Sequence, residues 1–211
     1  MCFSADASVI TFIVGILGAI LCISLGSITD KIIGYFFGFT SLIQGIEYLL
    51  WKHQYCDDYN RKISILGMIL NNLQPFVFGL IILLINTKTP NKNWIILFMI
   101  LYLCVIIPYS IQFDRTKQCT LKDETHLKWN WNLMKKSSFV YTVFIIFLCL
   151  FGLLGFPKFI YGVYFSLIII ITYLTSKYFY SATFSGALWC YYSVFLPIIY
   201  YLLRINHLIQ F

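Results

Sequence analysis

Glu47 is the one acidic residue that lies well inside an apolar run of this chain of 211 residues. Thr40, Gln44 and Glu47 occupy positions i, i+4 and i+7, which share one face of a helix, and Trp51 continues that face. Ionisable side chains within a bilayer are costly and by default indicate function. We therefore expect Glu47 to be the charged group of a site for a cation or a proton.

Amide side chains form a second group, in which Asn71, Asn72 and Gln74 directly precede Pro75. Proline cannot donate its backbone hydrogen bond, so it favours a kink and frees a nearby carbonyl. Later in the chain, Ser185 and Trp189 are four residues apart and share a helical face. The predicted hydrogen-bonding partners of a ligand are Gln44, Asn71, Asn72, Gln74 and Ser185, with Trp189 as an aromatic wall.

These polar side chains also have a purely structural interpretation. Asn, Gln, Ser and Thr often hydrogen-bond neighbouring membrane helices, and each such bond contributes about 0.6–2 kcal/mol. The sequence leaves both interpretations open.

Two pairs of metal-ligating residue types fall in loops on the same side of the predicted membrane span. His53 precedes Cys56 by three residues, and His126 follows Cys119 by seven. Zinc or copper accepts such ligands, although the spacing matches no zinc-finger pattern. A Cys56–Cys119 disulfide is the second interpretation and requires an oxidising compartment. Free thiols are the third.

The composition predicts that the bilayer is the solvent of this chain. Hydrophobic residues make up 60%, charged residues 11%, and the mean hydropathy is +0.83. Soluble domains contain about 45–50% apolar and about 25% charged residues. We expect one domain, an all-α polytopic transmembrane bundle of seven helices of about 20 residues each. The predicted helices span residues 8–26, 31–51, 63–85, 94–111, 138–155, 159–176 and 182–203.

The longest polar stretch, residues 112–137, is predicted to cap the mouth of a pocket formed by the polar side chains. A turn at 123–124 would place Leu121 opposite His126. Trp129 and Trp131 suit interfacial anchors.

The net charge of +7 does not indicate nucleic-acid binding, because the basic residues lie between apolar runs, as juxtamembrane residues do. Ten of the 15 Lys and Arg residues fall on the side of the amino terminus. The positive-inside rule therefore predicts a cytoplasmic amino terminus and an external or luminal carboxyl terminus. The first apolar segment lacks a basic leader, so we expect it to be a retained helix.

Several motifs are shared with a known group of sequences. They are Cys2-Phe-Ser-Ala-Asp-Ala-Ser8, Gln44 and Glu47 with Trp51, Gln74-Pro75, Cys119 with His126 and Trp129, and Gly186 to Cys190. The chain thereby resembles a family of uncharacterised multi-spanning membrane proteins that open with Met-Cys-Phe-Ser-Ala. The family has no established activity, so the resemblance supplies no catalytic residues. It implies that the amino-terminal segment belongs to the mature protein and that the quoted positions belong together.

Three functions are compatible with these observations. The leading hypothesis is a protein that binds, senses or conducts a small ligand or ion through a one-sided polar pocket open towards the amino-terminal side. The second is a membrane-embedded enzyme acting on lipid, with or without a metal at the Cys/His loops. The third is a structural or assembly protein. The seventh helix carries no lysine for a retinal Schiff base, and the cofactor stays unknown.

Overall fold

The computed structural model describes residues 4–116, 118–123, 126–179 and 185–209. The side chains of residues 179 and 185–188 lie outside the described part as well. Seven α-helices make up most of this part of the chain, so the predicted all-α bundle is confirmed. They are α1 (Ala5–Leu25), α2 (Ile28–Lys52), α3 (Asp58–Ile85), α4 (Lys92–Thr116), α5 (Ser137–Gly155), α6 (Phe159–Phe179) and α7 (Ser185–Ile205).

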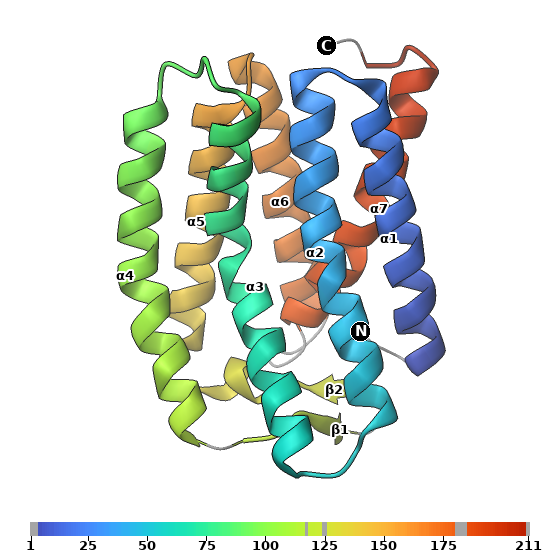
Figure 1. Cartoon of the computed structure of the whole chain (residues 1–211), viewed down its shortest axis with the longest axis vertical. Helices are drawn as coiled ribbons and strands as arrows, with labels where there is room; N and C mark the ends of the chain where they lie inside the picture. The colour runs from blue at the N-terminus through green and yellow to red at the C-terminus, as the bar shows by residue number, and fades with distance from the viewer. Residues whose placement is uncertain (1–3, 117, 124–125, 180–184, 210–211) are drawn as a thin grey trace.

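Helices α1 to α6 are each long and apolar enough to cross a bilayer, and the described apolar part of α7 covers Trp189–Ile205. The chain is therefore an integral membrane protein. Helix α2 is the most enclosed, with 61% of its apolar segment buried, whereas α4 and α6 have 28%. Helix α2 packs against α1, α3 and α7. Figure 1 shows the helices running along the long axis, with the start of α1 and the end of α7 at opposite ends.

Capping residues explain why several helices begin before their predicted starts. Helix α3 begins five residues early because the Asp57 side chain accepts a hydrogen bond from the Asn60 backbone N–H at 2.9 Å. Ser27 and Asp30 form a capping box that starts α2 at Ile28. Helix α4 continues to Thr116, so its last turn consists of residues that were predicted to belong to the following loop. The predicted start of the last helix, residue 182, lies outside the described residues.

The polar stretch after α4 forms an ordered cap at the amino-terminal face (Figure 1). It contains the antiparallel strands β1 (Leu121–Asp123) and β2 (His126–Lys128), and the 3-10 helix η1 (Asn130–Leu133). Asp123 pairs with His126 and Leu121 pairs with Lys128, so the predicted pairing of Leu121 with His126 is wrong by two residues. Leu127 is buried, at 1% exposure, between the half-buried His126 and Lys128, because successive residues of a strand point to opposite faces.

The prediction that Trp129 and Trp131 are interfacial anchors is also wrong. Both side chains are 1% exposed, and their ring centroids lie 4.7 Å apart. Trp131 also packs edge-on against Phe113 of α4 at 5.9 Å. The two indoles are therefore part of the core, where they pack against each other and against the ring of Phe113.

Candidate functional site

The predicted polar side chains gather in the half of the bundle that lies beneath the hairpin. Gln44 and Glu47 of α2 are fully buried, and Asn71, Asn72 and Gln74 of α3 are at most 3% exposed. We define the polar cluster as these five residues together with Tyr141 of α5 and Cys190 of α7.

Cys190 connects the three central helices within this cluster. Its sulfur lies 3.8 Å from Asn71 Oδ1, and its thiol also interacts with the Gln74 side chain. Glu47 lies within electrostatic range of the same thiol. The acid of α2 and the amides of α3 therefore belong to one site, which α7 closes.

Hydrogen bonds tie the cluster to the outer helices. Thr11 Oγ1 of α1 donates to Gln44 Oε1 at 2.9 Å. Asn71 Nδ2 donates to Asn72 Oδ1 at 3.2 Å and to the Tyr141 hydroxyl at 3.5 Å. Tyr102 of α4 donates to the Asn72 carbonyl at 2.5 Å. Helix α3 is thus held from both sides at the turn before Pro75, where proline removes a backbone donor.

The cap joins the same network. The Tyr141 hydroxyl donates to Asn132 Oδ1 of η1 at 2.5 Å, and the Tyr109 hydroxyl of α4 donates to the Trp131 carbonyl at 2.5 Å. Asn60 of α3 exchanges two hydrogen bonds of 3.0 Å with the backbone of Thr120. The hairpin is therefore fixed to the helices that carry the polar cluster.

Several buried polar atoms in and next to the cluster have no hydrogen-bond partner among the described residues. These atoms are Gln44 Nε2, Trp51 Nε1, Asn72 Nδ2 and Gln74 Oε1. Each unsatisfied buried group costs about 1–3 kcal/mol, and water cannot reach them freely from lipid. A small hydrogen-bonding species beside these atoms would remove that cost.

The space in the cluster is small. A cavity of about 10 Å³ lies between Asn71, Tyr141 and Trp189, which is close to the minimum for one water molecule, about 10–15 Å³. Trp189 is 3% exposed and packs edge-on against Phe144 at 5.6 Å, as the predicted aromatic wall would. The space beside these rings is therefore at most that of one water molecule. The Ser185 side chain lies outside the described residues.

The Cys/His loops contain a disulfide between Cys56 and Cys119, with Cα atoms 5.5 Å apart. His53 Nε2 lies 2.8 Å from Asp57 Oδ2, while His126 lies in β2 opposite Asp123. Hydrogen bonds from the Asn60 backbone and from His53 hold the pKa of Asp57 below its ordinary value. No group of three or more His, Cys, Asp or Glu side chains in the described part of the chain is arranged to hold a metal ion.

Sequence reasoning missed Thr11, Tyr102, Asn132 and Tyr141, and it named Cys190 only as the end of a shared motif. Tyrosine and threonine are common in membrane helices, so their types carried no signal. Only Cys190 had a signal in the sequence, because it follows Trp189 in a motif that was already noted.

Comparisons with known proteins found no matching protein-family model, no matching curated protein and no matching solved structure. The resemblance noted in the sequence therefore rests on its own motifs.

Proposed function

We propose that this membrane protein reversibly binds a proton, or a small monovalent cation in its place, at Glu47. The observation that carries the proposal is the complete burial of this acid, at 0% exposure, inside a cluster of amide side chains between membrane-spanning helices. Burying a charged carboxylate is costly unless it is compensated, and intramembrane acids often serve proton or ion pathways.

The dimensions of the cluster support an occupant of atomic size. The cavity beside Asn71 and Tyr141 measures about 10 Å³, which is too small for an organic ligand. The atoms of Gln44, Asn72 and Gln74 without partners among the described residues offer both donors and acceptors. The two donors, Gln44 Nε2 and Asn72 Nδ2, suit the oxygen of a water molecule, and the acceptor, Gln74 Oε1, suits the proton or cation that accompanies it.

The disulfide affects two of the predictions made from the sequence, namely the metal-assisted enzyme and the orientation in the membrane. A thiolate metal site for a lipid-directed enzyme would need Cys56 and Cys119, which are bonded to each other. Disulfides persist in oxidising compartments. We therefore propose that the amino-terminal face is extracytoplasmic, which is the reverse of the orientation predicted from the lysine and arginine count. The polar cluster would then lie beneath the external cap.

Infrared difference spectroscopy between acidic and alkaline pH tests proton binding, because a buried protonated carboxyl group absorbs apart from exposed ones. We expect a buried carboxyl signal in the wild type that is lost in Glu47→Gln, whereas any signal from the other fully buried acid, Asp30, is retained. Asp6→Asn is the matched control, since Asp6 is an exposed acid on the same face. An unchanged signal in Glu47→Gln would exclude the proposal. Addition of sodium at fixed pH distinguishes the occupants, because a competing cation removes the carboxyl signal.

Thiol labelling tests the orientation. Intact cells are treated with a membrane-impermeant reductant and then with an impermeant maleimide, followed by peptide mapping. We expect labelled Cys56 and Cys119 without permeabilisation, whereas the buried Cys22 and Cys190 stay unlabelled. Labelling that requires permeabilisation would restore the orientation predicted from the charges.

A further inference from the structure

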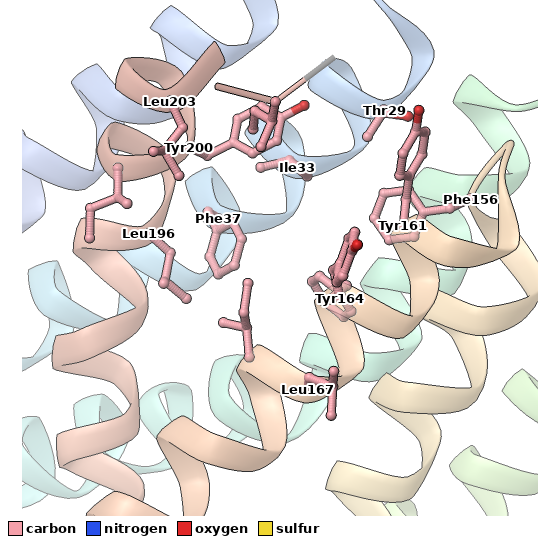
Figure 2. Close-up of a pocket in the computed structure, with 14 residues that line it drawn as sticks. Thr29, Ile33, Phe37, Phe156, Tyr161, Tyr164, Leu167, Leu196, Tyr200 and Leu203 are labelled. Atoms are coloured by element: carbon pink, nitrogen blue, oxygen red, sulfur yellow. The ribbon is translucent and has the colours of Figure 1, made fainter. Parts of the chain in front are cut away.

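A second and much larger cavity lies in the other half of the bundle. It has a volume of about 440 Å³, within the range of about 300–1,000 Å³ typical of small-molecule sites. Figure 2 shows Ile33 and Phe37 of α2 between side chains of α6, such as Tyr164, and side chains of α7, such as Leu196. Its lining is almost entirely apolar, so it is unsuited to water or ions.

The exposure of the lining residues shows where this cavity opens. The floor is buried, with Phe37 at 4% and Phe165 at 7% exposure. The walls are exposed along the side of the bundle, with Tyr164 at 56%, Ile168 at 43% and Ile199 at 51%. Because these residues lie on membrane-spanning helices, the cavity opens sideways into the hydrocarbon of the bilayer.

The length of the cavity corresponds to one leaflet. Thr29 lies at its outer end and Phe37 deep inside it (Figure 2). The eight helical steps from Thr29 to Phe37 span about 12 Å. One leaflet contributes about 15 Å of the hydrocarbon core. An extended acyl chain from the adjacent leaflet therefore matches the depth of the cavity.

Cationic side chains lie at the outer end. Lys158 Nζ lies 5.3 Å above the ring of Tyr161, which lines the cavity. Arg204 Nε lies 3.4 Å from Asp30 Oδ1, and the Tyr200 hydroxyl donates to the same oxygen at 2.5 Å.

The charge of this face is positive overall. Asp30 is the only acid at this end of the described bundle, where the basic residues are Lys31, Lys88, Lys92, Lys158 and Arg204. Such a face attracts anionic headgroups by about 1 kcal/mol per basic residue near the surface.

We propose that this cavity binds one acyl chain of an anionic phospholipid, with the phosphate beside Lys158 and Arg204. The acyl chain fills an apolar space whose lining would otherwise lack contacts. The basic residues favour a headgroup of negative charge. Binding of this lipid requires only that the protein is embedded in a membrane, and it is independent of the proton site at Glu47.

Native mass spectrometry tests the proposal on the full-length protein. The protein is reconstituted in vesicles of equimolar phosphatidylglycerol and phosphatidylcholine, extracted in mild detergent and weighed intact. We expect the wild type to retain one phosphatidylglycerol molecule. Leu196→Trp fills the cavity from α7 and should lower that retention about tenfold or more. Ile100→Trp is the control, because Ile100 lies on the exposed face of α4, away from the cavity.

Two further variants complete the test. Ile168→Trp fills the cavity from α6 and replaces Leu196→Trp if that protein fails to fold. Lys158→Gln should lower the preference for phosphatidylglycerol over phosphatidylcholine about fivefold, while the acyl chain of a lipid still binds in the cavity. Equal retention of both lipids by the wild type would overturn the headgroup assignment. Retention that is unchanged in both cavity-filling variants would overturn the site itself.

Discussion

The two halves of this bundle are packed in opposite ways. Beneath the hairpin, the polar side chains of α2, α3, α5 and α7 are closely packed, and the cavity beside Asn71 and Tyr141 measures only about 10 Å³. In the other half, α2, α6 and α7 leave an apolar cavity of about 440 Å³ that opens towards lipid. Helices α6 and α7 are closer together at the hairpin end than at the carboxyl-terminal end (Figure 1).

The difference follows from what the bilayer can provide. Lipid tails offer no hydrogen bonds, so polar groups in a membrane must be satisfied by the protein and are drawn together. Apolar side chains gain little from burial against one another, because lipid tails are equally apolar. A gap between apolar helices is therefore tolerated where lipid fills it, whereas a gap between polar groups is not.

Removal of the disulfide should have the largest effect on this contrast. The double substitution Cys56→Ser and Cys119→Ser should lower the free energy of unfolding in detergent by about 2–4 kcal/mol, because the bond closes a long loop. It should also loosen the polar half selectively. Alkylation of Cys190, in the cluster, should accelerate, while alkylation of Cys22, which donates to the Pro197 carbonyl in the other half, should not. Equal acceleration at both thiols would show that the halves are not independent.

A pair of tyrosine substitutions gives a smaller effect and compares the halves directly. Tyr141→Phe removes the hydroxyl that donates to Asn132 and accepts from Asn71. It should cost about 1–1.5 kcal/mol in the free energy of unfolding. Tyr164→Phe is the matched control at the exposed wall of the cavity and should change that value by less than about 0.5 kcal/mol. Similar costs for the two variants would contradict the contrast.

The smallest predicted effect is a pH dependence at the loop that anchors the cap. The pKa of Asp57 is lowered from its ordinary value of 3.8 by hydrogen bonds from the Asn60 backbone and from His53. A carboxyl group with a lowered pKa in the folded state stabilises the protein above its unfolded pKa. This contribution is lost as the pH falls from about 3.8 through the lower folded value.

Thermal unfolding across this acidic range measures the effect. Asp57→Asn keeps a capping side chain but does not titrate, so its unfolding temperature should fall less steeply with decreasing pH than that of the wild type. Parallel curves for the two proteins would show that Asp57 does not contribute.

Local patterns in the sequence account for the helices and for the faces that they bury. The spacing of Thr40, Gln44 and Glu47 predicted one helical face, and all three side chains are fully buried. The hydrophobic runs located seven helices, with errors mainly at capped ends such as Asp57. The hairpin register and the burial of Trp129 and Trp131 were not predictable, because they depend on contacts with α4 and on the disulfide to the loop before α3.

The sequence by itself therefore determined that this chain is a helical membrane protein with a polar group in one membrane half, because hydropathy and helical periodicity are local properties. Only the tertiary structure decided how closely the helices approach. It closed the polar half around Cys190 and Tyr141, and it left the apolar half open between α6 and α7. Packing distances between helices depend on pairs of side chains far apart in the chain, and no local pattern encodes them.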